Sequence, residues 1–114
     1  MTTVDWNQEL IRAALPQAVL AVLRNGESHG YAIAELLREN GFDRIKGGTL
    51  YPLLKRLEDQ GLVVHRWQHD LAGPGRKQFA LTDDGRTELE RAASAWQQMD
   101  KALTTLRSNR QEQL

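Results

Sequence analysis

The sequence predicts a mainly α-helical fold with a small β-hairpin (α+β). Three observations lead to this prediction. Apolar residues recur at helical spacing in several stretches, the spacing becomes extended on both sides of one Gly- and Pro-containing turn, and the last helical stretch keeps its apolar seam for about two and a half heptads. With 114 residues, 40% of them hydrophobic, the chain can form one compact core.

The first predicted helix follows an N-terminal capping signal. Asp5 can cap it, with Gln8 three residues further on, and apolar residues then recur as far as the Asn25-Gly26 pair, where glycine can end a helix. Pro16 interrupts this stretch. Because proline removes a backbone hydrogen bond and clashes with the preceding turn, we expect either a kink or two shorter helices that meet there.

A second and a third helix follow, joined by a short Gly-containing connection. Ser28 is the expected N-cap of the second helix, which runs to about Glu39. The third helix opens at Gly48-Thr49 and closes at Gly61. Its apolar face is made by Leu50, Leu53, Leu54 and Leu57.

After the third helix the apolar spacing changes from helical to extended. Residues 62–67 and 76–81 are expected to be strands, and residues 72–75 between them are rich in turn formers. This pattern predicts a β-hairpin with a flexible tip.

The last predicted helix is long and starts at Thr82 or Asp83. Apolar residues along it recur mostly at alternating intervals of four and three, which predicts pairing with helices of a second copy of the chain. Residues 109–114 are polar and are expected to fray. The predicted dimer interface consists of Leu10, Leu89, Ala92, Trp96, Met99, Leu103 and Leu106.

This order of elements is typical of a winged helix-turn-helix domain. In such a domain one helix enters the major groove of DNA, and flanking basic groups contact phosphates. We therefore expect residues 1–81 to form a DNA-binding domain, residues 82–108 a dimerisation helix and residues 109–114 a frayed tail. A homodimer carries two such DNA-binding domains, so we expect it to bind a roughly palindromic site on double-stranded DNA.

The third helix and the hairpin carry side chains suited to DNA. Gly48 lets the backbone approach closely, Thr49 and Tyr51 offer hydrogen-bonding groups on the first turn, and nearby lysines and arginines can reach phosphates. The alternative interpretation of Tyr51 is a half-buried core residue. The predicted DNA contacts are Tyr31, Lys46, Gly48, Thr49, Tyr51, Lys55, Arg56, Arg76 and Lys77.

Charge and composition narrow the function further. The net charge is zero, but residues 44–77 hold seven basic and three acidic residues, so positive charge gathers around the third helix and hairpin. The chain has no cysteine, which excludes disulfide chemistry and cysteine metal sites. No apolar run approaches the ~18 residues of a membrane span, and no signal-peptide pattern is present, so we expect a cytoplasmic protein without a membrane partner.

Several short motifs, in order, resemble the PadR family of transcriptional regulators. They are His29-Gly30-Tyr31, Gly48-Thr49-Leu50-Tyr51-Pro52, Lys55-Arg56-Leu57-Glu58, Gly75-Arg76-Lys77 and Leu81-Thr82. The resemblance covers about residues 15–86 and implies a dimeric winged-helix protein that usually represses genes. The short chain with one C-terminal helix is similar to the small-subunit branch of the family. The resemblance implies DNA contact at or near Tyr31, Thr49, Tyr51, Lys55, Arg76 and Lys77.

The last helix also resembles a ligand-binding segment of multidrug-sensing PadR members, through Ser94-Ala95-Trp96 and Met99-Asp100-Lys101. This resemblance implies that a flat aromatic compound stacks on Trp96 at the dimer interface, with Asp100 attracting cationic ligands. Trp96 as an ordinary residue of the dimer seam is the alternative. The implied ligand-binding residues are Leu15, Ala18, Val19, Trp96, Met99 and Asp100.

Other function classes fit the sequence less well. An enzyme is not expected, because the chain has no cysteine nucleophile, Gly-x-Ser-x-Gly motif or phosphate loop. His65 and His69 are four residues apart in a predicted strand, roughly 13 Å from each other, so no metal is expected, and no cofactor is implied. The main rival is a winged-helix module that binds proteins or ligands without specific DNA binding, a reading that zero net charge favours.

Overall fold

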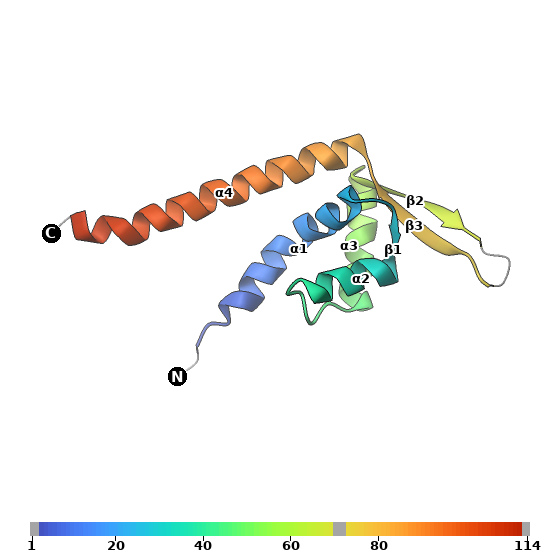
Figure 1. The fold of residues 1–114 in the computed structure, drawn as a ribbon, viewed down its shortest axis with the longest axis horizontal. Coiled ribbons are helices and arrows are strands. Elements are labelled where there is room, and N and C mark those ends of the chain that lie inside the picture. Colours follow the sequence, from blue (N-terminus) through green and yellow to red (C-terminus); the bar gives the residue numbers. More distant parts are fainter. Residues whose placement is uncertain (1–2, 70–72, 113–114) are drawn as a thin grey trace.

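The part of the chain that the structure describes folds into four helices and a small three-stranded sheet, whose hairpin projects from one side of the helices (Figure 1). The computed structural model describes residues 3–69 and 73–112, with side chains as far as residue 108. The prediction of a mainly α-helical fold with a small β-hairpin is confirmed, although a third strand joins the hairpin. The elements are α1 (Trp6–Arg24), β1 (Ser28–His29), α2 (Gly30–Glu39), α3 (Gly47–Asp59), β2 (Val63–Gln68), β3 (Arg76–Leu81) and α4 (Asp83–Glu112).

Helix α1 is continuous through its internal proline. The side chain of Asp5 caps its first turn by accepting a hydrogen bond of 3.0 Å from the backbone N–H of Gln8, as predicted. Pro16 lies inside the helix, which continues to Arg24. The alternative of two shorter helices is therefore wrong. The chain leaves the helix through Gly26, whose φ of 142° is open to glycine and strained for other residues.

The start of α2 differs from the prediction. The capping residue is His29, not Ser28, because Nδ1 of His29 accepts a hydrogen bond from the backbone N–H of Ala32. Ser28 and His29 have extended backbone and form β1, which pairs antiparallel with β3 through Phe79 and Gln78. The capping histidine therefore also belongs to the sheet, and it ties the start of α2 to the hairpin.

The helix-turn-helix is formed by α2 and α3, as predicted. The Nε group of Arg38 in α2 donates a hydrogen bond of 3.2 Å to the carbonyl oxygen of Ile45 and so fastens the connection that leads into α3. Gly61, with a φ of 78°, turns the chain out of α3 toward the sheet. Strand β3 then lies between β1 and β2, and β2 pairs with β3 from Val63–Leu81 to Gln68–Arg76.

One hydrophobic core lies where the first three helices meet the sheet. The predicted apolar face of α3 is buried there, with each of its four leucines 5% exposed or less. The members of this core are Leu15, Val19, Leu20, Leu23, Ile33, Ala34, Leu37, Ile45, Leu50, Leu53, Leu54, Leu57, Val63, Phe79, Leu81 and Leu89. The core fixes one face of α3, so its other face is turned to the outside.

Helix α4 starts against the base of the hairpin and then leaves the body of the domain as a long arm (Figure 1). Thr82 caps it: its Oγ1 accepts a hydrogen bond of 2.9 Å from the backbone N–H of Gly85 and donates one of 2.7 Å to the carbonyl oxygen of Gly61. The helix continues to Glu112.

Candidate nucleic-acid interface

The outer face of α3 carries most of the predicted DNA contacts. All of those on α3 and at its start are exposed: Lys46, Gly48, Thr49, Tyr51, Lys55 and Arg56. No side chain caps the N-terminus of α3, and its first turn holds no acidic residue. Free backbone N–H groups and the positive end of the helix dipole therefore face outward beside Thr49, which is an arrangement that favours anions such as phosphate.

Tyr51 packs on the start of α2 and is also exposed. A Cβ atom on Gly30 would lie 2.5 Å from the Tyr51 hydroxyl oxygen, so only glycine fits beneath this ring. The side chain nevertheless remains 52% exposed. Tyr51 therefore combines the two interpretations made from the sequence: its ring packs between α3 and α2, and part of it stays available to a partner. Tyr31, 64% exposed, lies nearby and is stacked with His29.

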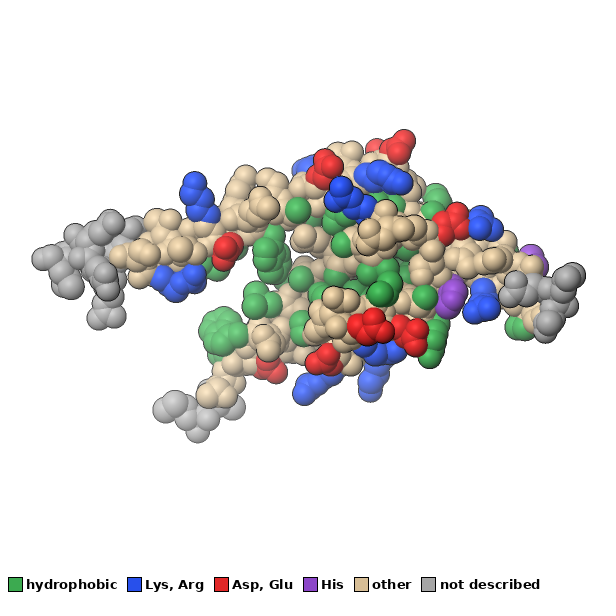
Figure 2. All heavy atoms as spheres, viewed as in Figure 1, with side chains coloured by type: hydrophobic (Ala, Val, Ile, Leu, Met, Phe, Trp, Pro, Cys, Tyr) green, Lys and Arg blue, Asp and Glu red, His purple; other side chains and the backbone are tan. Residues whose placement is uncertain are grey.

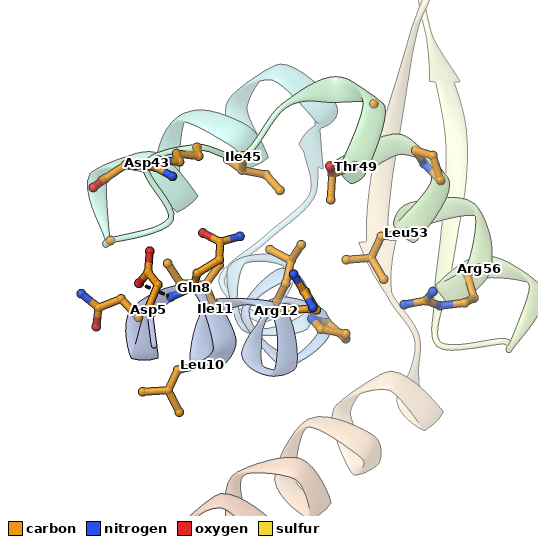
Figure 3. A pocket seen from close by; sticks show the side chains of 17 residues that line it. Asp5, Gln8, Leu10, Ile11, Arg12, Asp43, Ile45, Thr49, Leu53 and Arg56 are labelled. Carbon is orange, nitrogen blue, oxygen red and sulfur yellow. Dashed lines mark hydrogen bonds between the residues drawn. The ribbon is translucent and has the colours of Figure 1, made fainter. Parts of the chain in front are cut away.

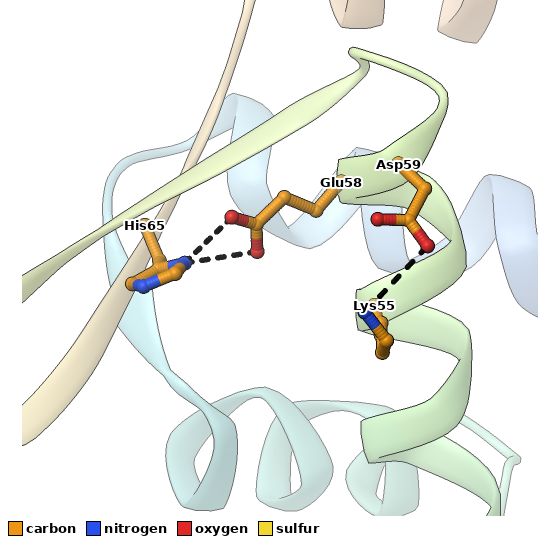
Figure 4. Close-up of polar contacts among 4 residues, drawn as sticks. All are labelled: Lys55, Glu58, Asp59 and His65. Atoms are coloured by element: carbon orange, nitrogen blue, oxygen red, sulfur yellow. Dashed lines mark hydrogen bonds and ion pairs between the residues drawn. The ribbon is translucent and has the colours of Figure 1, made fainter.

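An ion pair and a histidine–carboxylate hydrogen bond involve the far half of α3 (Figure 4). Lys55 Nζ lies 3.8 Å from Asp59 on the exposed surface, so one acidic group partly offsets this predicted phosphate contact. Glu58 accepts a hydrogen bond of 2.7 Å from Nδ1 of His65 in β2. Because Glu58 and His65 are both partly buried, this pair fixes how the hairpin sits relative to α3.

The hairpin adds exposed cations of its own. Arg76 and Lys77 both begin β3 and are exposed, as the sequence predicted. Arg66 on β2 is engaged differently: it forms an ion pair of 2.7 Å with Glu27, and this hydrogen-bonded carboxylate raises the pKa of the guanidinium. Glu27 thereby neutralises one of the seven basic residues counted in this region. Sequence reasoning missed Trp67, which lies opposite Lys77 in the sheet.

A groove of about 910 Å³ runs between the first half of α1 and the connection from α2 to α3 (Figure 3). Its walls include Thr49 and Arg56 from the outer part of α3, and Leu15 from α1. The predicted ligand-binding residues on α4 do not line it. The groove therefore differs from the expected ligand pocket, which combined α1 with α4.

The predicted ligand-binding residues fall into two groups. Val19 has no exposed surface and Leu15 is 7% exposed, because both pack in the core, and Ala18 is partly buried against it. Trp96, Met99 and Asp100 are exposed on the α4 arm. The three residues on α1 therefore pack in or against the core, whereas the three on α4 lie on the surface. Val19 in particular has no surface to offer a ligand.

The predicted dimer interface divides in a similar way. Leu89 is 6% exposed and belongs to the core of its own chain, and Ala92 is partly buried. The others lie on the surface, and Figure 2 shows apolar side chains of the α4 arm and of α1 bordering an open notch between these two helices. The exposed members are Leu10, Trp96, Met99, Leu103 and Leu106, between 41% and 68% exposed.

The described residues show neither a metal cluster nor a membrane span. No cluster of three or more His, Cys, Asp or Glu side chains there has the arrangement of a metal site. None of the described helices combines the length and the apolar character that crossing a membrane requires.

Comparison with known proteins establishes the family. The sequence profile of the transcriptional regulator PadR-like family matches residues 19–91. The chain belongs to this family. The negative transcriptional regulator PadR of Bacillus subtilis (strain 168) is 36% identical to this chain over 77 residues. The match covers 66% of this chain and 42% of that protein, so the chain spans less than half the length of this relative.

Solved structures of PadR proteins have the same fold. A PadR family regulator from Eggerthella lenta DSM 2243 is 34% identical with a TM-score of 0.82, over 89% of this chain and 88% of that one. Bacillus subtilis PadR in complex with operator DNA is 33% identical with a TM-score of 0.64, over 70% of this chain and 47% of that one. These similarities confirm the PadR-like winged-helix fold.

The PadR match covers only part of the predicted site residues. Residues 19–91 include every predicted DNA contact, from Tyr31 to Lys77. The ligand-binding residues on α4, which start at Trp96, lie outside the match. The match therefore places the chain in a family of transcriptional regulators through the segment that holds the predicted DNA contacts.

Proposed function

We propose that this PadR-family chain is a homodimeric repressor that binds a roughly palindromic operator in double-stranded DNA. The observation that carries the proposal is the exposed, uncapped first turn of α3, which holds Thr49. The wing, the β2–β3 hairpin, adds the exposed cations Arg76 and Lys77 and is joined to the far half of α3 through His65 and Glu58. The first turn would read base edges in the major groove, and the basic side chains would hold phosphates. Operator binding implies a protein that works in the cytoplasm.

The dimer would form through the notch between α1 and α4. Apolar side chains on both sides of the notch are exposed in a single chain, and burying them in a partner would stabilise the pair. Met99, Leu103 and Leu106 continue the seam along α4 beyond the body of the domain. Leu89 is left out of this interface, because it is already buried. Two winged domains held together by their crossed α4 arms would present both α3 helices to one DNA molecule.

The same seam is the proposed site of an effector. Trp96 is 41% exposed, and Asp100 lies one helical turn further on, so a flat aromatic ring could stack on the indole while a positive group faces the carboxylate. Such a drug-like ligand would release the repressor if it bound the DNA-free arrangement of the two winged domains more tightly. Ala18 and Met99 remain the candidate walls, since Val19 is buried.

Fluorescence polarisation with a labelled duplex from upstream of the gene that encodes this chain tests the proposal. We expect tight binding that weakens steeply between low and physiological salt, and release by a flat cationic dye. Absence of binding at either salt concentration would refute the repressor and favour the second candidate, a winged-helix module for proteins or ligands. Zero net charge is the observation that favours this candidate.

The effector site has its own test. Trp96→Ala should weaken binding of the dye by about tenfold and leave DNA affinity nearly unchanged, because the indole supplies the stacking surface but lies far from α3 along the chain. Isothermal titration of the dye into both proteins measures the difference. Equal dye affinity in the two proteins would remove Trp96 from the site.

A further inference from the structure

One face of the wing changes from apolar core to an aromatic and cationic surface. Along β2 the side chains of Val63, His65 and Trp67 alternate onto the same face, and their partners on β3 are Leu81, Phe79 and Lys77. The first pairs are buried in the core or partly buried, whereas Trp67 and Lys77 lie beyond it and are exposed. This face is turned toward α3, because His65 on it binds Glu58 of that helix.

The exposed pair is held together. Lys77 Nζ lies 5.8 Å from the centre of the Trp67 ring, within the range of a cation–π interaction, and the ring of His69 is stacked on the same indole. Trp67 is 56% exposed, so its indole is not a core residue. No hydrogen bond of the indole N–H occurs within the described residues, which leaves one donor for a partner.

We propose that Trp67 is a DNA-contact residue of the wing: its indole packs on a deoxyribose of the duplex backbone while Lys77 beside it binds the adjoining phosphate. This inference rests on the proposed function, which places α3 in the major groove. A sugar offers an apolar face next to a charged phosphate, and the Trp67–Lys77 pair presents the matching combination, a flat apolar ring beside a cation. The pair also lies on the same face of the wing as the contact with α3, so it continues the proposed interface.

The two residues should contribute to affinity in different ways. A lysine on a phosphate releases counterions, so its removal lowers the slope of log affinity against log salt by about 1. An uncharged indole on a sugar releases none, so its removal lowers affinity at every salt concentration without changing the slope. This difference separates direct contact by Trp67 from a general loss of wing charge.

The experiment measures polarisation of a labelled duplex of mixed sequence over a range of low salt concentrations. Such a probe needs no knowledge of the operator, because backbone contacts do not depend on sequence. Trp67→Ala should weaken binding by about tenfold with an unchanged slope, and Trp67→Phe should restore most of the affinity. Val64→Ala is the matched control: Val64 is 50% exposed on the opposite face of the same strand, and its loss should not alter affinity.

A second comparison separates contact from positioning. If Trp67 only holds Lys77 in place, Trp67→Ala has no further effect in a Lys77→Ala background, and that result would overturn the inference. We expect the loss to persist in that background. Unchanged affinity of Trp67→Ala, with thermal unfolding like that of the original chain, would also overturn it while the proposed function stands. A chain that binds no duplex at any salt concentration would overturn both.

Discussion

Gly85 offers the sharpest test of how α4 is joined to the winged domain. A Cβ atom at this position would collide with the backbone carbonyl oxygen of Leu62 and lie 2.6 Å from Cδ1 of Leu81. The carbonyl cannot move freely, because it accepts a hydrogen bond of 3.1 Å from the backbone N–H of Thr82. In Gly85→Ala the start of α4 must therefore shift away from the base of the wing.

The magnitude follows from two opposing effects. Overpacking costs about 1–3 kcal/mol, and the upper half of that range applies here because the Cβ atom meets a backbone carbonyl. Alanine favours a helix over glycine by about 0.5–1 kcal/mol, so Gly85→Ala should lower the free energy of unfolding by about 1–2.5 kcal/mol. Gly48→Ala is the matched control, because nothing lies within 4 Å of a Cβ atom there. It should leave stability unchanged or raise it slightly, while weakening DNA binding if the backbone of α3 approaches a phosphate at this point.

Urea unfolding followed by circular dichroism, at one fixed protein concentration for all variants, measures both effects. The fixed concentration matters because the proposed dimer couples stability to association. If Gly85→Ala unfolds at the same urea concentration as the original chain or a higher one, the close contact between α4 and Leu62 is wrong. A destabilised Gly48→Ala would show that Gly48 is required by the fold, not by a partner.

The remaining predictions concern charge on α3 and the cap of α4. Asp59→Asn should raise affinity for a mixed-sequence duplex by about twofold to threefold, because it removes the acidic partner of Lys55 and a charge that repels phosphate. Fluorescence polarisation measures this affinity. An unchanged value would mean that Lys55 does not face DNA. Thr82→Ala should lower the free energy of unfolding, measured in urea, by about 1 kcal/mol, because the backbone N–H of Gly85 loses its acceptor. Thr82→Ser keeps the hydroxyl group and should not lower it. An equal loss in both variants would mean that the methyl group of Thr82, not its hydroxyl group, stabilises the helix start.

Most of the architecture could be predicted because local signals were strong. Helix ends coincide with capping residues and glycines such as Asp5 and Gly61, and the change of apolar spacing after α3 located the wing. The strand β1 could not be predicted, since two residues hold no periodicity and their partner lies some fifty positions away at Phe79. That pairing also explains why His29, not Ser28, caps α2.

The site was predicted less completely, for a physical reason. Heptad spacing shows which residues share a face of α4 but not which neighbour covers that face, so Leu89 was assigned to a dimer seam although the domain's own core buries it. Val19 was likewise assigned by resemblance to a ligand site at the dimer interface, although its side chain is buried in the core. Trp67 was not predicted as a site residue, because an apolar side chain in a strand usually belongs to the core, whereas this one lies beyond it. Its alternation with Val63 and His65 was the available signal.

The central claim is that the first turn of α3 reads DNA sequence, and the affinity ratio between the chain's own upstream duplex and a scrambled duplex of equal composition tests it most directly. The account predicts a clear preference for the upstream duplex, and a loss of about 1–3 kcal/mol of that preference in Thr49→Val, with the salt slope unchanged. An equal ratio in the original chain and in Thr49→Val would contradict sequence reading by this turn of the helix.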